Sequence, residues 1–180
     1  DFLGQFNKAT ELLSHRGPDA SGIKTISQSG IALGHTRLSI QDLSEAGDQP
    51  MQSLDGNILI TFNGEIYNFP ELRDHLVKLG YSFFSHTDTE VLLNLYIEFG
   101  LDCFKMLDGI FAVALFNKKT NKLTIARDGL GVKPLYFYNS DDCFIFSSEI
   151  KAIKELIENT KLNIDKQNLN RYLTFQWCPG

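Results

Sequence analysis

The dipeptide Asn63-Gly64 constrains the fold of this chain more than any other feature, because of what stands on either side of it. It follows Asn57–Phe62, a run typical of a β-strand. Asn-Gly after such a run is the commonest signal of a hairpin turn, and for the dipeptide alone that alternative stays open. Here, however, Pro70 soon follows and predicts the start of a helix that ends at Gly80. The pattern therefore favours a strand that leads into a helix and presents its exposed end to a ligand.

The remaining pattern predicts strands, then helices, then further strands and helices, which is typical of a layered α+β domain. Two antiparallel sheets faced by helices are the simplest packing. Thr87 and Glu90 predict a capping box at one helix start. The expected helices are Phe6–Ser14, Pro70–Gly80, Thr87–Phe99, Glu149–Ile157 and Lys166–Leu173. The expected strands are Gly22–Ser27, Ile31–Ile40, Asn57–Phe62, Ile110–Phe116, Leu123–Ala126, Leu135–Tyr138 and Cys143–Ser147.

Length and charge narrow the class of protein. The 180 residues predict one domain, 1–180, and a net charge of -5 argues against nucleic acid or an anionic membrane as a partner. No apolar run approaches the roughly 18 residues of a membrane-spanning helix. Cys103, Cys143 and Cys178 are widely spaced, so neither a disulfide framework nor a metal site is expected. We expect a cytoplasmic protein.

A group of polar residues suggests a site for a free amino acid with a side-chain amide. The Asn63 amide and the Gly64 N–H are donors suited to the oxyanion of a tetrahedral intermediate. The planar fork of Arg37 suits an α-carboxylate, and Asp88, with Glu65 assisting, suits an ammonium group. Arg37 alone is equally explained by a structural ion pair, and Asp88 alone by a helix start.

Seven segments in order resemble the glutaminase half of glutamine-hydrolysing asparagine synthetases, within the class II (N-terminal nucleophile) glutamine amidotransferases. The resemblance implies the four-layer αββα fold of these Ntn-hydrolase-like domains. It also implies that Arg37, Leu38, Ile40, Asn63, Glu65 and Asp88 bind L-glutamine, with Asn63 and Gly64 as the oxyanion hole. The segments are His15–Asp19, His35–Leu43, Gly47–Met51, Asn63–Asn68, Asp88–Val91, Ala126–Tyr136 and Ser148–Ala152.

The family's nucleophile is the side chain of an N-terminal Cys, whose α-amine acts as base. Position 1 here is Asp, so the family's first strand and its nucleophile are expected ahead of it. The alternative is a degenerate, non-catalytic domain that binds glutamine or a partner. The cysteines present in the chain are expected to be small buried hydrophobes rather than nucleophiles.

Residues 170–180 resemble the start of the connection to an ATP-dependent synthetase domain. The resemblance implies that this domain receives ammonia and amidates aspartate, and that ATP and Mg belong to it. No cofactor is expected within residues 1–180. The expected partners are L-glutamine and the protein's own synthetase domain, and a homodimer is compatible with this interpretation.

Overall fold

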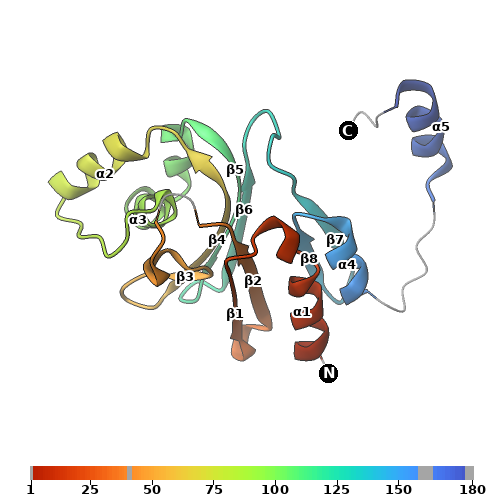
Figure 1. The fold of residues 1–180 in the computed structure, drawn as a ribbon, viewed down its shortest axis with the longest axis horizontal. Coiled ribbons are helices and arrows are strands. Elements are labelled where there is room, and N and C mark those ends of the chain that lie inside the picture. Colours follow the sequence, from red (N-terminus) through yellow and green to blue (C-terminus); the bar gives the residue numbers. More distant parts are fainter. Residues whose placement is uncertain (1, 40–41, 158–163, 177–180) are drawn as a thin grey trace.

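The computed structural model describes residues 2–39, 42–157 and 164–176 (Figure 1). Its helices are α1 (Phe2–Glu11), α2 (Phe69–Lys78), α3 (Asp88–Phe99), α4 (Ile150–Leu156) and α5 (Lys166–Phe175). Its strands are β1 (Ala20–Ile26), β2 (Ile31–Arg37), β3 (Met51–Gln52), β4 (Ile58–Ile66), β5 (Gly109–Asn117), β6 (Lys122–Arg127), β7 (Tyr136–Asn139) and β8 (Phe144–Ser147).

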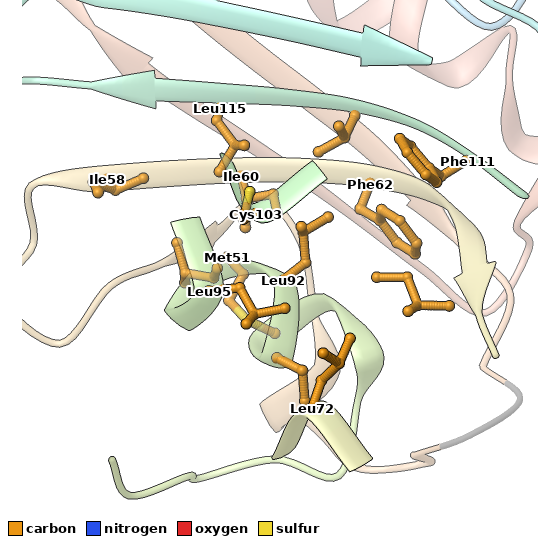
Figure 2. Close-up of a cluster of buried hydrophobic side chains, with 14 of the residues drawn as sticks. Met51, Ile58, Ile60, Phe62, Leu72, Leu92, Leu95, Cys103, Phe111 and Leu115 are labelled. Carbon is orange, nitrogen blue, oxygen red and sulfur yellow. The ribbon is translucent and has the colours of Figure 1, made fainter. Parts of the chain in front are cut away.

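An antiparallel sheet in the order β3-β4-β5-β6 forms one inner layer, and α2 and α3 cover its outer face (Figure 1). The sheet alternates its side chains between two faces, as strand geometry requires. Ile58, Ile60 and Phe62 of β4 point to the helices and pack with Leu92 and Leu95 of α3 in the main hydrophobic core (Figure 2). The odd-numbered residues of β4 therefore face the opposite side of the sheet.

The second inner layer consists of the hairpins β1-β2 and β7-β8, which α1 and α4 cover. A smaller apolar cluster joins the two layers and includes Leu33 of β2, Leu59 of β4 and Phe116 of β5. The order of layers is helix, sheet, sheet, helix, so the expected αββα class is confirmed. The expectation of two sheets differs in one respect. The described strands form three sheets, because β2 pairs only with β1 and β8 only with β7.

Several predicted boundaries need correction. The first helix runs over Phe2–Glu11 instead of Phe6–Ser14. No strand was expected between residues 41 and 56, but Met51–Gln52 form the short strand β3. Strand β4 does not end at Phe62 but continues through Asn63-Gly64 to Ile66, paired with β5 along its whole length. The hairpin alternative for Asn63-Gly64 is therefore wrong, and so is their placement beyond the strand's end.

The capping box at α3 forms only in part. The Thr87 hydroxyl accepts a hydrogen bond from the Glu90 N–H at 3.2 Å, as expected. The Glu90 carboxylate instead accepts hydrogen bonds from the N–H groups of Phe84 (3.0 Å) and Ser85 (2.7 Å). It thereby fixes the turn that leads into the helix.

Helix α5 ends the described part of the chain, and none of its residues is buried. Among the described helices, none is long and apolar enough to cross a membrane.

Candidate oxyanion and amino-acid site

The edge of β4 that faces away from β5 carries the backbone part of the site. Gly64 lies opposite Phe111 of β5, but the two are not hydrogen-bonded to each other. Phe111 turns both backbone groups the other way: its N–H donates to Asp128 Oδ2 (3.1 Å), and its carbonyl accepts from the Asp128 N–H (2.8 Å). Because hydrogen-bonded and non-bonded pairs alternate in an antiparallel ladder, the Gly64 N–H points to the opposite edge.

Side chains from elsewhere in the fold bind the N–H groups on either side of Gly64. The Phe62 N–H donates to Gln49 Oε1 at 2.6 Å, and the Ile66 N–H donates to Asp88 Oδ2 at 3.0 Å. Gly64 lies between them, and β3 pairs with β4 only at Leu59 and Ile60. No described strand therefore pairs with this edge at Gly64, and its N–H can meet a ligand.

Asn63 lies on the face of β4 that looks toward the second inner layer. Its Nδ2 donates to Ser148 Oγ at 3.4 Å, a long hydrogen bond that reaches from β4 to the residue after β8. The amide therefore stands beside Gly64 with a weakly held donor, which suits a group that must also bind a transient oxyanion.

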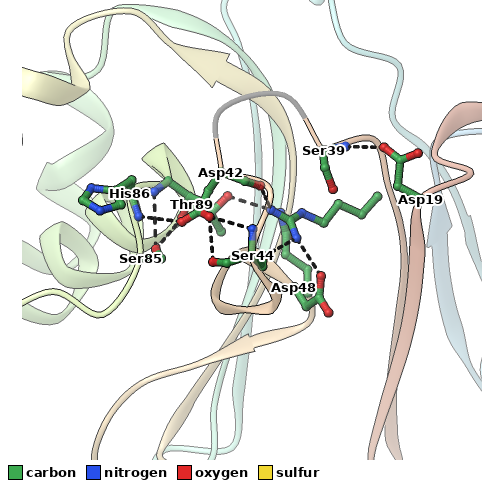
Figure 3. Close-up of polar contacts among 11 residues, drawn as sticks. Asp19, Ser39, Asp42, Ser44, Asp48, Ser85, His86 and Thr89 are labelled. Carbon is green, nitrogen blue, oxygen red and sulfur yellow. Dashed lines mark hydrogen bonds and ion pairs between the residues drawn. The ribbon is translucent and has the colours of Figure 1, made fainter.

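Arg37 is buried at the end of β2, and both of its terminal nitrogens donate hydrogen bonds within the protein. Nη1 donates to the Ser44 carbonyl and to Asp48 Oδ1, both at 2.8 Å, and Nη2 donates to the Asp42 carbonyl. Figure 3 shows these acceptors, all from the segment that follows β2. The structural ion pair considered for Arg37 therefore exists, with Asp48 as the partner. The Asp48 side chain is 45% exposed, whereas that of Arg37 is 9% exposed.

Asp88 is buried at the first position of α3, and Glu65 is exposed one residue beyond Gly64. Burial raises the pKa of Asp88, and the nearby charge of Glu65 raises it further. Hydrogen bonds from backbone N–H groups, including that of Ile66, oppose this rise. Asp88 thus combines the helix-start role and a position at the site. A cation bound there would favour its ionised form.

One cavity of about 680 Å³ brings these residues together. Six of the seven expected binding or oxyanion residues line it, namely Arg37, Leu38, Asn63, Gly64, Glu65 and Asp88, while Ile40 lies outside the described residues. The cavity runs between the second layer's two hairpins: every residue from Ile31 to Leu38 and from Cys143 to Ser148 lines it. Gln49 and Ser148 also line it, and sequence reasoning gave them no individual role.

Charged residues form a second cluster where the segment after α1 meets the start of α4. Glu149 Oε1 accepts from His15 Nε2 (2.8 Å) and Arg16 Nη1 (3.2 Å), and its Oε2 lies 3.1 Å from Lys151 Nζ. Burial opposes ionisation, but these three partners lower the pKa of Glu149 to about 2. The cluster adjoins Ser148, so it anchors the 15–16 segment near the Asn63 amide.

The cysteines show no sign of activation in the described residues. Cys103 is buried in the main core, and burial raises the pKa of its thiol to about 12. Cys143 is exposed, so the expectation that it is a buried hydrophobe is wrong, and Cys178 lies outside the described residues. Within that same part of the chain, no cluster of His, Cys, Asp and Glu could hold a metal ion.

The fold defines the class of the domain: a four-layer αββα arrangement of the Ntn-hydrolase type, with amide and backbone donors at an inner sheet edge. Within that class, residues 3–180 match the family described as "Glutamine amidotransferase domain", and the chain belongs to this family.

The names of similar proteins support the asparagine-synthetase branch of the family, which the sequence suggested. The chain is 41% identical to the "Putative asparagine synthetase [glutamine-hydrolyzing] 2" of Methanocaldococcus jannaschii, over 98% of this chain and 37% of that protein. It is 37% identical to asparagine synthetase 1 of Bacillus subtilis, over 99% of this chain and 30% of that protein. The chain thus spans about a third of the length of these relatives.

Solved structures agree on the fold. The glutamine phosphoribosylpyrophosphate amidotransferase from B. subtilis matches 82% of this chain and 39% of its own, with a TM-score of 0.68 and 22% identity. An allosteric regulatory enzyme of purine biosynthesis matches 69% of this chain and 29% of its own, with a TM-score of 0.59 and 25% identity.

Proposed function

We propose that this domain hydrolyses L-glutamine to glutamate and ammonia, with Asn63 and Gly64 as the oxyanion hole. The observation that carries the proposal is the Gly64 N–H, directed into a cavity between two side-chain-held N–H groups and beside the Asn63 amide. Two donors at one point suit the negative oxygen that develops when a nucleophile adds to an amide carbonyl.

Two charged residues that line the cavity suit the α-carboxylate and the α-ammonium group of glutamine. Arg37 would bind the α-carboxylate, which would replace the exposed Asp48 as its carboxylate partner. Asp88 would bind the ammonium group, with Glu65 assisting, and Leu38 and Ile40 would contact the substrate beside Arg37. A free amino acid then lies with its side-chain amide toward Gly64.

The nucleophile in this proposal is a cysteine on a strand that precedes Asp1. The cavity runs along β2 and β8, whose facing edges have no partner strand among the described residues. A strand there would complete one continuous inner sheet. The α-amine of this cysteine would take the thiol proton, and the thiolate would attack the glutamine amide carbon. The C–N bond would then break, and ammonia would leave with the proton that the cysteine's α-ammonium group returns. Water would then hydrolyse the thioester to glutamate.

The ammonia would pass to an ATP-dependent synthetase domain of the same protein, which would amidate aspartate with ATP and Mg. The support is that relatives over nearly the whole chain are named asparagine synthetases, and that the chain spans about a third of their length. Residues 170–180 would begin the connection to that domain. A homodimer and a cytoplasmic location remain predictions.

Two measurements test this function. The coding region upstream of Asp1 should encode a cysteine that becomes N-terminal, and the full-length protein should release glutamate and ammonia from glutamine. In that protein Asn63→Ala should lower kcat by about 10²–10³, because one oxyanion donor is lost. Asn57→Ala, at the other end of β4, is the matched control and should change kcat little. An upstream region without cysteine, or no release of glutamate, would leave the degenerate binding domain as the better interpretation.

A further inference from the structure

The free edge of β4 presents three N–H groups in a row, and only the middle one is available to a ligand. Strand alternation directs the N–H groups of Phe62, Gly64 and Ile66 to the same side. Gln49 Oε1 accepts from the first at 2.6 Å, and Asp88 Oδ2 accepts from the last at 3.0 Å. The pair of side chains therefore selects Gly64 as the donor.

Both acceptors are fixed to the first turn of α3. Asp88 is its first residue, and Gln49 is tied to the next residue because its Nε2 donates to Thr89 Oγ1 at 3.2 Å. Gln49 is buried, and its amide bridges β4 and α3 with one accepted and one donated hydrogen bond. The helix start thus holds the strand edge at two points on either side of Gly64.

Removal of the Gln49 acceptor would have two consequences for an oxyanion at Gly64. The strand edge would lose one of its two fixed points, the Phe62 N–H, so the orientation of the Gly64 N–H would be less restricted. The Phe62 N–H would also become a second donor facing the same cavity, which both residues line. Oxyanion stabilisation depends on donors held at about 2.7–3.1 Å in advance, so a less restricted Gly64 N–H weakens it.

We propose that Gln49 is a positioning residue of the oxyanion hole, acting through the Phe62 N–H; this inference rests on the proposed glutaminase function. Gln49 touches no reacting atom. It sets which backbone donor on the strand edge is free and how that donor points.

The kinetic test uses the full-length protein with two substitutions at position 49. Gln49→Met keeps the volume but removes the acceptor, and should lower kcat about tenfold while KM for glutamine changes less than about twofold. Gln49→Glu keeps an acceptor for the Phe62 N–H and should restore most of kcat. The matched control is Ser53→Ala, because Ser53 Oγ accepts the Ile58 N–H at 2.9 Å at the other end of β4. This control should lower stability without lowering kcat.

A second readout does not depend on hydrolysis. Residue-resolved amide hydrogen exchange in the same proteins should show the Phe62 N–H protected in wild type and in Gln49→Glu, and unprotected in Gln49→Met. If wild type hydrolyses no glutamine, the proposed function fails, and with it the role assigned to Gln49, whatever the exchange data show. If wild type is active and Gln49→Met loses Phe62 protection but keeps its kcat, the positioning role alone is overturned. Unchanged Phe62 protection in Gln49→Met overturns it as well.

Discussion

At the scale of single residues, Gly64 meets two requirements that no other residue type combines. Its N–H must face the cavity, and its α-carbon must lie against β5. A Cβ at this position would lie 2.3 Å from the Ile110 carbonyl oxygen and 2.7 Å from Phe111 Cα. These are backbone atoms of a paired strand, so they cannot move without distorting the ladder.

We therefore expect Gly64→Ala to destabilise the domain by about 1–3 kcal/mol, in the range of other overpacked sites. Urea unfolding would measure the change. Gly129→Ala is the matched control, since a Cβ there meets no atom within 4 Å. Equal stability of the two variants would contradict the close contact between β4 and β5.

The sequence predicted some of these residues and not others, for a physical reason. Asn63, Gly64 and Asp88 stand in short motifs whose residue types already indicate oxyanion and ammonium binding. Gln49 and Ser148 act through distant partners: Phe62 lies 13 positions from Gln49, and Asn63 lies 85 positions from Ser148. Such pairings depend on tertiary packing, which local patterns do not encode.

At the scale of elements, the sequence predicted the type of each helix and most strands, but not where β4 ends. The predicted strand ended at Phe62 because Asn-Gly is a strong turn signal, although Ile66 continues the apolar pattern of the strand. Pairing with β5 as far as Gly109 keeps Asn63 and Gly64 in the strand. The short strand β3 was missed because its two residues gain their strand conformation from β4 alone.

The cap of α3 allows a test at this scale. Thr87→Ala removes the hydroxyl that accepts the Glu90 N–H and should cost about 1 kcal/mol of stability. Asp165→Ala removes the equivalent cap of α5, whose Oδ1 accepts the Gln167 N–H at 2.9 Å. Because no residue of α5 is buried, chemical unfolding of the layered body should be unaffected by this second change. A similar loss of unfolding free energy in both variants would show that α5 contributes to the stability of the four αββα layers.

At the scale of the whole molecule, the αββα order followed from helices alternating with antiparallel strands and from a family resemblance. The division of the second inner layer into two hairpins did not, because strand pairing between distant segments leaves no local signal. The cavity lies between those hairpins, and β2 contributes the partly buried His35 to it.

His35 should make the stability of the whole fold depend on pH. Burial lowers the pKa of His35 to about 4, and the charge of Arg37 adds to this effect while Asp48 opposes it. Between about pH 6.5 and 4 the unfolded chain therefore binds more protons than the folded one, so stability falls as pH falls through this range. The contribution is at most about 3 kcal/mol.

The measurement is urea unfolding across this pH range for wild type and His35→Gln. The difference between the two isolates His35 from other groups such as Asp88, whose raised pKa acts in the opposite sense. His86→Gln, at an exposed histidine, should retain the wild-type dependence. Parallel curves for wild type and His35→Gln would show that His35 is not buried in its neutral form.

The use of a main-chain donor at Gly64 also affects how such a site can vary during evolution. A side chain such as Asn63 can lose its function by many different point mutations. The N–H of residue 64 is lost only to proline, and no single-nucleotide change converts a glycine codon into a proline codon. Outright loss of this N–H is therefore closed to one-step mutation, and other substitutions at position 64 act through the clash of their Cβ with β5.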